Sequence, residues 1–203
     1  KALKLNSFYD YDENGTSHPH DEKSNITRFC YVGSFYVAQD WKKVIIILNK
    51  VLANNKDIRV DFYGTGNPLM TKNFFNDELK HQVTINDPLT GDQLEACMKP
   101  YDVGLFSLSS DIRNSNIPGK FLMYCKLGMP SLAIVSPDTE VSAIIKDNNL
   151  GAVGDIDNET SACKAFSKVI LNCRAYDSPA ILNYFKNNYS VDAALTEILI
   201  HIE

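Results

Sequence analysis

Apolar residues along the chain form two kinds of segment that follow one another in regular alternation. Short apolar or alternating runs, rich in β-branched and aromatic residues, predict strands at 29–32, 58–63, 83–85, 102–107, 131–135 and 151–153. Helical spacing of apolar residues, with proline or glycine near some of the helix ends, predicts helices at 40–52, 69–80, 90–98, 118–127, 139–146, 160–171, 179–187 and 190–202. Strand and helix therefore alternate through most of the chain, which ends in helices.

This alternation predicts an α/β fold. Because each right-handed crossover places its helix against the sheet, the strands should form a Rossmann-like, doubly wound, six-stranded parallel sheet covered on both faces. With the strand order 3-2-1-4-5-6, ligands bind at the carboxyl ends of the strands where the order reverses. The loops after the first and fourth strands, residues 33–39 and 108–120, are expected to meet at that point.

The segment 116–131 reads as a loop, a helix, a glycine stop and a buried strand. Pro118 suits the first helical position, because it has no N–H to leave unpaired and its φ is already helical. The N–H groups of Gly119, Lys120 and Phe121 should then point out of the helix start, where the helix dipole and the Lys120 ammonium favour an anion. A plain capped surface helix explains the same residues equally well.

Residues 1–27 are polar and rich in turn formers, which predicts a linker or extended N-terminal segment before a domain at 28–203. His18 and His20 resemble half of a metal site, but no third ligand follows nearby, and a solvated loop explains them better. The sequence begins at Lys1 without an initiator methionine, and we expect it to be a fragment of a longer protein.

Composition narrows the functional classes. The formal net charge of −5 argues against nucleic acid or a polybasic membrane surface as the main partner. The five cysteines are scattered in apolar surroundings without a C-x-x-C pair, so reduced thiols in a cytoplasmic protein are expected rather than a metal site. No apolar run approaches the length of a membrane span, and no signal-peptide pattern opens the sequence.

Common catalytic motifs are missing from the sequence. A dinucleotide-binding G-x-G-x-x-G should follow the first strand, but Gly33 stands alone there, and the pair Gly64 and Gly66 follows the second strand. An NAD-type Rossmann protein is therefore disfavoured. The sequence also lacks a P-loop, H-E-x-x-H and G-x-S-x-G, and its four histidines suggest no pairing of nucleophile and base, which leaves hydrolase chemistry unsupported.

Several other side chains have two explanations. Trp41 and the tyrosines at 31, 36, 63 and 124 could stack a sugar or a base, but such residues near strand ends more often pack in the core with a polar tip outward. Asp111 and Arg113 follow the fourth strand, where they either contact a ligand or pair with each other in solvent.

The order of several short motifs resembles the C-terminal half of a GT-B glycosyltransferase. These motifs are Tyr31-Val-Gly33-Ser34 with Ala38-Gln39, Asp61-Phe-Tyr-Gly64-Thr-Gly66, Tyr101-Asp-Val-Gly-Leu105, Asn116-Ile-Pro-Gly-Lys120 with Leu127-Gly-Met-Pro130, and Asn149-Leu-Gly151. Within that class the chain is most similar to the retaining family 4 enzymes of bacterial surface-polysaccharide assembly. It most resembles the N-acetylfucosamine-transferase-like branch, which carries Ala-Gln where others carry Lys-Gly.

The resemblance covers the whole chain and implies a donor-binding domain for a nucleotide-diphospho-sugar. The donor-binding positions that it implies are Gly33, Ser34, Gln39, Ile85, Asn86, Ser115, Asn116, Ile117, Pro118, Gly119, Lys120 and Met123. The turn after the first strand would approach the diphosphate, the helix start at 118–120 would hold its charge, and the loop after the third strand would contact the base. The donor would be a UDP-, GDP- or dTDP-sugar, with no cofactor and no metal, and the catalytic residues stay unassigned.

Four positions depart from the family pattern. Family members usually have Glu where this chain has Ser115 and Met123, and often have Arg or Lys where it has Ser34 and Gln39. Loss of charged contacts, at about 1.5–3 kcal/mol each, would weaken donor binding unless other groups substitute. A non-catalytic sugar-nucleotide-binding or interaction domain therefore stays open as an alternative to a retaining, hexosyl-type glycosyltransferase.

If the chain is part of a glycosyltransferase, we expect an acceptor-binding domain to precede it and the isolated fragment to be inactive. The enzyme would be cytoplasmic, and peripheral association with the inner face of the plasma membrane through the preceding domain is compatible with it.

Overall fold

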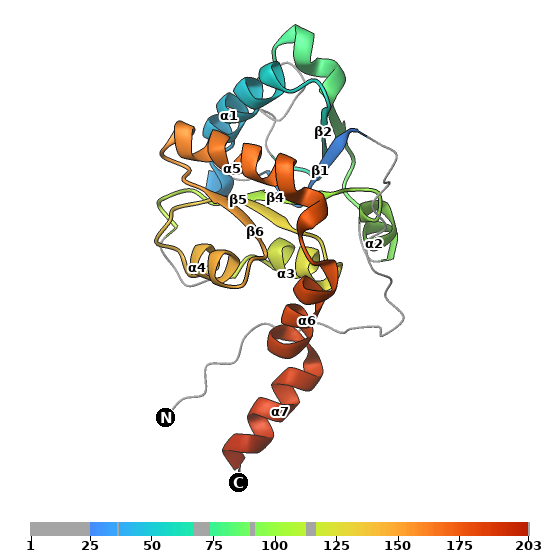
Figure 1. Ribbon diagram of the computed structural model, residues 1–203, viewed down its shortest axis with the longest axis vertical. Helices are drawn as coiled ribbons and strands as arrows, with labels where there is room; N and C mark the ends of the chain where they lie inside the picture. The colour runs from blue at the N-terminus through green and yellow to red at the C-terminus, as the bar shows by residue number, and fades with distance from the viewer. Residues whose placement is uncertain (1–24, 36, 67–73, 90–91, 113–116, 203) are drawn as a thin grey trace.

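The computed structural model describes residues 25–35, 37–66, 74–89, 92–112 and 117–202 (Figure 1). Its centre is a six-stranded sheet in the order β3-β2-β1-β4-β5-β6, in which every pairing is parallel. The strands are β1 (Thr27–Val32), β2 (Ile58–Tyr63), β3 (Val83–Asn86), β4 (Val103–Ser107), β5 (Ser131–Ile134) and β6 (Gly151–Gly154). The expected fold class and strand order are confirmed.

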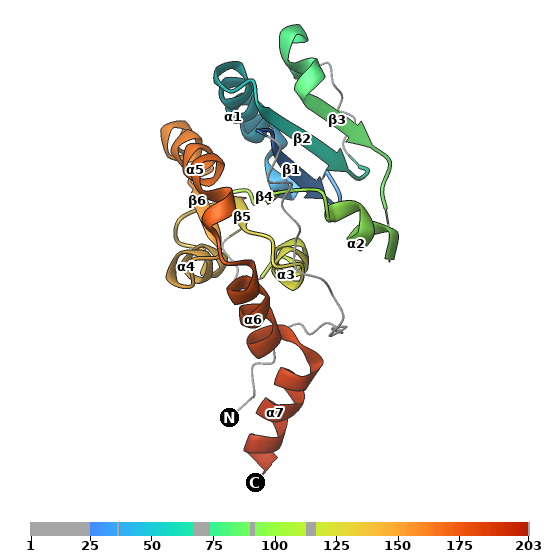
Figure 2. The same ribbon diagram turned by 45° about the vertical axis from the view of Figure 1, so that its right-hand side comes forward.

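Helices cover both faces of the sheet. They are α1 (Trp41–Asn54), α2 (Asp92–Met98), α3 (Gly119–Lys126), α4 (Glu140–Asp147), α5 (Glu159–Asn172), α6 (Ser178–Tyr189) and α7 (Val191–Ile202), with 3-10 turns η1 (Val37–Gln39), η3 (Asp77–Gln82) and η4 (Cys173–Ala175). Figure 2 shows α1 and α5 on one face and α2, α3 and α4 on the other. α6 packs on α3, and α7 extends from α6 away from the sheet, so the helical C-terminus is also confirmed.

The core is divided by the sheet into two apolar clusters. The cluster beneath α1 and α5 includes Phe29, Tyr31, Leu48 and Phe62, each with no exposed surface. The cluster on the opposite face joins α3, α4 and α6 to the other sides of the same strands. Strands buried on both faces explain why 103–107 reads as a continuous apolar run. None of the described helices is long and apolar enough to cross a membrane.

The helix expected at 69–80 is wrong over its described part. Residues 74–76 are not α-helical, and a 3-10 helix runs from Asp77 to Gln82 instead. Asn76 adopts an extended ψ of 141°, and its N–H donates to the Asn49 side chain at 3.1 Å, which removes it from a helical ladder. A short polar side chain that competes for backbone hydrogen bonds therefore outweighed the helical spacing of the apolar residues.

Candidate functional site

The loops that follow β1 and β4 meet at the carboxyl edge of the sheet, as expected. The Ser107 hydroxyl donates to the backbone carbonyl of Gln39 at 2.7 Å, and the N–H of Ser109 donates to the carbonyl of Ala38 at 2.7 Å. Because β1 and β4 are neighbours where the strand order reverses, these bonds fix the position at which a parallel α/β sheet usually binds its ligand.

A glycine turn follows β1 and packs against the turn that follows β2. Gly33 has a φ of +124°, in the region that side chains disfavour, and its N–H donates to the Tyr63 carbonyl at 2.9 Å. A Cβ on Gly64 would lie 1.8 Å from the Gly33 carbonyl oxygen, so glycine is required there. The segment after the second strand thus packs directly against the turn after the first.

Helix α3 begins close to this turn. Pro118 is its N-cap residue, with an extended ψ of 131°, so the helix starts one residue later than the expected position at Pro118. The N–H of Phe121 donates to the Pro118 carbonyl at 2.9 Å, which corrects the expectation that this N–H points outward unpaired. Gly119 and Lys120 remain the first-turn amides that an α-helix leaves without an intrahelical acceptor.

The ammonium of Lys120 lies directly over the glycine turn. Its Nζ donates to the Tyr31 hydroxyl at 3.1 Å and lies 4.7 Å from the centre of the Tyr31 ring. A Cβ on Gly33 would lie 3.5 Å from this nitrogen, so the ammonium is close to the turn backbone. Burial lowers the pKa of Lys120 from 10.5 to about 8, because the site withdraws the charge from water. Helix α3 and β1 therefore bring a desolvated cation and a glycine backbone together.

The remaining predicted positions lie around this cation or further along the same edge. Asn86 ends β3, and its carbonyl accepts from the Gly64 N–H at 3.3 Å, which links it to the glycine turns. Ile85 packs against the cluster beneath α1 and α5, whereas Ile117 and Met123 are half-buried against the opposite cluster. Ser34 is half-buried in the turn, and Ser115 and Asn116 lie outside the described residues.

Gln39 is held by its backbone but not by its side chain. Its carbonyl accepts from Ser107, as described above, whereas its Oε1 atom is buried without a hydrogen-bond partner among the described residues. A buried amide oxygen without a partner costs free energy. Gln39 is therefore the one donor-binding prediction for which the described structure shows an unmet hydrogen-bonding capacity.

The aromatic side chains near the edge are mostly core residues. Trp41, Tyr31 and Tyr124 are at most 3% exposed, so they are not available to stack a ligand. The core alternative considered from the sequence is confirmed for these three, and Tyr36 lies outside the described residues. Sequence reasoning missed that the hydroxyl of one core tyrosine, Tyr31, reaches the site.

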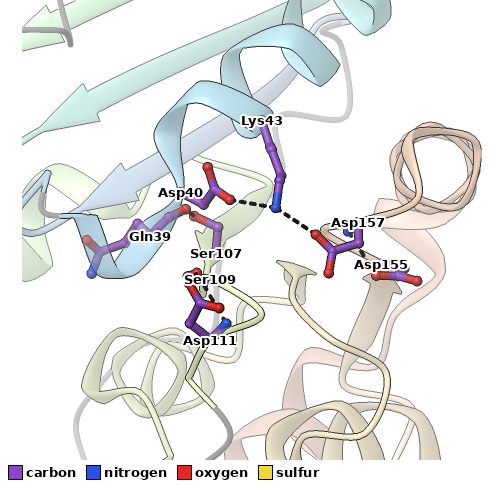
Figure 3. Close-up of polar contacts among 8 residues, drawn as sticks. All are labelled: Gln39, Asp40, Lys43, Ser107, Ser109, Asp111, Asp155 and Asp157. Carbon is purple, nitrogen blue, oxygen red and sulfur yellow. Dashed lines mark hydrogen bonds and ion pairs between the residues drawn. The ribbon is translucent and has the colours of Figure 1, made fainter.

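Sequence reasoning also missed an ion-pair network beside the site (Figure 3). Lys43 of α1 pairs with Asp40 at 2.8 Å and with Asp157, after β6, at 2.6 Å. Arg113, the predicted partner of Asp111, lies outside the described residues; the Asp111 N–H donates to the Ser109 hydroxyl at 3.3 Å, and that hydroxyl lies 3.5 Å from an Asp111 carboxylate oxygen. The i, i+3 spacing of Asp40 and Lys43 could have signalled the first pair. The second joins residues too distant in the sequence for any local signal.

Within the described ranges, no group of three or more His, Cys, Asp or Glu side chains is arranged to hold a metal ion. All five cysteines are free; Cys30, Cys125 and Cys173 are buried, and burial raises the pKa of each of their thiols. The predicted apolar setting is confirmed for these three, whereas their reduced state stays a prediction.

Comparison with solved structures identifies the fold. The lipopolysaccharide outer core galactosyltransferase WaaB, in its apo form, superposes with a TM-score of 0.75 and 13% identity over 97% of this chain and 54% of WaaB. A variant of S. aureus TarM, in complex with fondaparinux, α-GlcNAc-glycerol and UDP, matches with a TM-score of 0.69 and 13% identity over 91% of this chain and 37% of TarM. The fold is that of a GT-B C-terminal domain.

A glycosyl transferase C-terminal domain solved by itself also matches. The C-terminal domain of LpcC, a glycosyl transferase group 1 family protein from Francisella tularensis, matches with a TM-score of 0.52 and 15% identity over 92% of this chain and 94% of its own. No known protein-family profile matches the chain, and no curated protein sequence is significantly similar to it.

The GT-B likeness confirms the expected resemblance at the level of the fold. The chain spans about half the length of WaaB and about a third of TarM. At identities of 13–15%, the similarity shows a shared architecture but does not identify the residues of a site. Assignment to family 4 and to its N-acetylfucosamine-transferase-like branch stays a prediction.

Proposed function

We propose that this GT-B domain binds the nucleotide-diphospho-sugar donor of a glycosyltransferase that acts in bacterial polysaccharide or glycan synthesis. The observation that carries the proposal is the position of Lys120, whose ammonium lies over the Gly33 turn at the edge where the strand order reverses. Among the described residues, no carboxylate pairs with this ammonium. Its natural counterion is then an anionic ligand.

The diphosphate is the part of the donor that this arrangement suits best. The Lys120 ammonium and the first-turn amides of α3 supply positive charge, and the Gly33–Ser34 turn lets backbone come close. Charge that develops on a departing nucleoside diphosphate would be stabilised by groups already held in place, which needs no metal. We also propose that the enzyme retains the anomeric configuration of the sugar, because the family 4 enzymes that the sequence resembles are retaining.

The base and the sugar would lie on either side of the diphosphate. Ile85 and Asn86 end β3 and are proposed to contact the base through backbone groups. Gln39, whose backbone carbonyl accepts from Ser107 at the end of β4, is proposed to lie beside the donor sugar. Met123 stands where an acidic residue would hold the ribose, so ribose recognition is proposed to be weak.

The solved relatives support this role by analogy. WaaB is a galactosyltransferase and the TarM variant was crystallised with UDP. Because both chains are much longer than this one, acceptor binding is assigned in this proposal to a part of the enzyme outside these 203 residues. The enzyme is proposed to act in the cytoplasm.

Isothermal titration calorimetry with UDP, GDP, dTDP and their sugars tests the proposal. At 100 times Kd, a bound nucleotide should stabilise the domain by about 2.7 kcal/mol, which thermal-shift measurements detect. Lys120→Ala should weaken the preferred nucleotide by about 1.5–3 kcal/mol. Lys168→Ala, an exposed lysine on α5, is the matched control and should bind like the wild type.

Two results would contradict the proposal. If no nucleoside diphosphate binds, the domain is not a donor site. If one binds with the same Kd in Lys120→Ala as in the wild type, the site is not at the start of α3.

A further inference from the structure

We propose that Tyr31 is a positioning residue for the donor site, whose hydroxyl holds the Lys120 ammonium above the Gly33–Ser34 turn. This inference rests on the proposed function for its effect on binding, but the contact itself exists without a ligand. It assigns to a fully buried tyrosine a role that neither its core packing nor the sequence pattern indicates.

The hydroxyl of Tyr31 joins the two segments that would hold the diphosphate. It donates to the backbone carbonyl of Ser34 at 2.6 Å, so its single proton is engaged in the turn. Its oxygen then accepts from Lys120 Nζ at 3.1 Å. One oxygen atom therefore fixes both the turn after β1 and the side chain from α3, although the two residues lie 89 positions apart.

The ring of Tyr31 is held in one position, because aromatic neighbours enclose it. Its centre lies 4.6 Å from that of Trp41 in an edge-to-face arrangement and 5.4 Å from that of Phe35 in a stacked one. The side chain has no exposed surface. The hydroxyl is therefore a fixed point on the core, and the flexible lysine is ordered against it.

Ordering of this kind matters because a free lysine side chain loses much rotamer freedom when it binds an anion. In this structure the face of the Tyr31 ring and its oxygen already hold the ammonium over the turn. No carboxylate competes for it among the described residues, and desolvation is the cause that lowers its pKa. The cation is thus prearranged before a phosphate arrives.

Tyr31→Phe tests the role, because it keeps the ring and its packing and removes only the oxygen. The affinity for a nucleoside diphosphate should fall roughly two- to tenfold, the range of one lost hydrogen bond, whereas the affinity for the free nucleoside should not change. Tyr124→Phe is the matched control: Tyr124 is also fully buried and its hydroxyl also donates to a backbone carbonyl, that of Leu105 at 3.0 Å. It should bind the diphosphate like the wild type.

A double-mutant cycle separates positioning from general damage to the fold. If Tyr31 acts through Lys120, Tyr31→Phe should lower diphosphate affinity less in a Lys120→Ala background than in the wild type, where the hydroxyl still holds the lysine. Equal losses in both backgrounds would overturn the proposal, because they would show that the hydroxyl acts independently of the lysine.

A measurement without ligand keeps this inference separate from the proposed function. In protein labelled with 13C-lysine, the 13Cε resonance of Lys120 reports its titration, and Tyr31→Phe should lower the pKa because an acceptor favours the charged ammonium. An unchanged Lys120 pKa overturns the positioning role even if nucleotides bind. If no nucleotide binds the wild type but the pKa falls in Tyr31→Phe, the donor proposal fails and the positioning contact stands.

Discussion

Lys120 makes the folded protein sensitive to pH. Burial lowers the pKa of its ammonium from 10.5 to about 8 in the folded state, whereas the unfolded chain leaves the group in water. Between these two pH values the unfolded chain binds more protons, so the free energy of unfolding should rise with pH across that window. Below about pH 8 the folded state carries a charged, desolvated lysine at full cost.

Lys120→Met should therefore raise the melting temperature at neutral pH, because the thioether fills similar space without a charge. The gain should shrink as pH rises from about 8 towards 10.5, where the wild-type lysine becomes neutral in the folded state. Calorimetric melting of both proteins across this range checks the prediction, with Lys168→Met on α5 as the exposed control. A lower melting temperature for Lys120→Met at neutral pH would show that the ammonium stabilises the fold.

Ribose recognition can be tested by introducing a carboxylate at Met123. This residue is half-buried on α3, so a carboxylate there has access to water at its edge. Met123→Glu should tighten nucleoside diphosphate binding by up to about 1.5–3 kcal/mol if both ribose hydroxyls reach the carboxylate. Titration calorimetry and a melting curve on the same variant decide the case: a large drop in melting temperature would mean that the substitution buries an unpaired charge.

At the residue scale, the sequence could indicate Lys120 but not its surroundings. A lysine in the first turn of a helix at the expected switch point is visible as a pattern. Its partner Tyr31 lies 89 positions earlier in a strand, and only the assembled sheet brings the two together. The same limit applies to Lys43 and Asp157, which are 114 positions apart. Ser115 and Asn116 lie outside the described residues, so their predicted roles stay predictions.

Among the elements, the two glycine turns after β1 and β2 behave as one unit. Gly64→Ala would place a methyl group 1.8 Å from the Gly33 carbonyl oxygen, which backbone must move to avoid. It should cost about 1–3 kcal/mol of stability or more, and weaken nucleotide binding because the Gly33–Ser34 turn shifts. Denaturant unfolding and calorimetry measure both effects. Thr65→Ala, at the exposed neighbouring position, should leave both near wild type, and an unaffected Gly64→Ala would show that the turns move independently.

The pattern of elements was predictable because alternation and periodicity are local. All six strands follow from apolar runs, their order is the one expected of a doubly wound fold, and β2 has the predicted bounds 58–63. The wrong predictions lie where a backbone hydrogen bond determines where a helix forms or begins. The extended Asn76 donates its N–H to Asn49 where the helix expected at 69–80 should continue, and Pro118 accepts from Phe121, which moves the first turn of α3.

The whole domain should fold without further protein. Its sheet is covered on both faces, and the two apolar clusters are closed by its own helices. We therefore expect one cooperative unfolding transition, together with nucleotide binding but no sugar transfer, since the proposed acceptor-binding part lies elsewhere. Circular dichroism during denaturation and a transfer assay with a radiolabelled donor check this. Detectable transfer to any acceptor by the 203-residue chain would overturn the assignment of acceptor binding to another part.

The contact between Tyr31 and Lys120 also bears on how the protein is made. During synthesis the first strand leaves the ribosome well before α3, so the turn after β1 exists for some time without its cation. A nascent chain stopped before residue 120 should therefore not be retained on a nucleotide resin, whereas one released after α7 should be. Nucleotide binding would thus mark chains in which α3 has docked on the sheet, and added nucleotide would favour their folded state over the unfolded one.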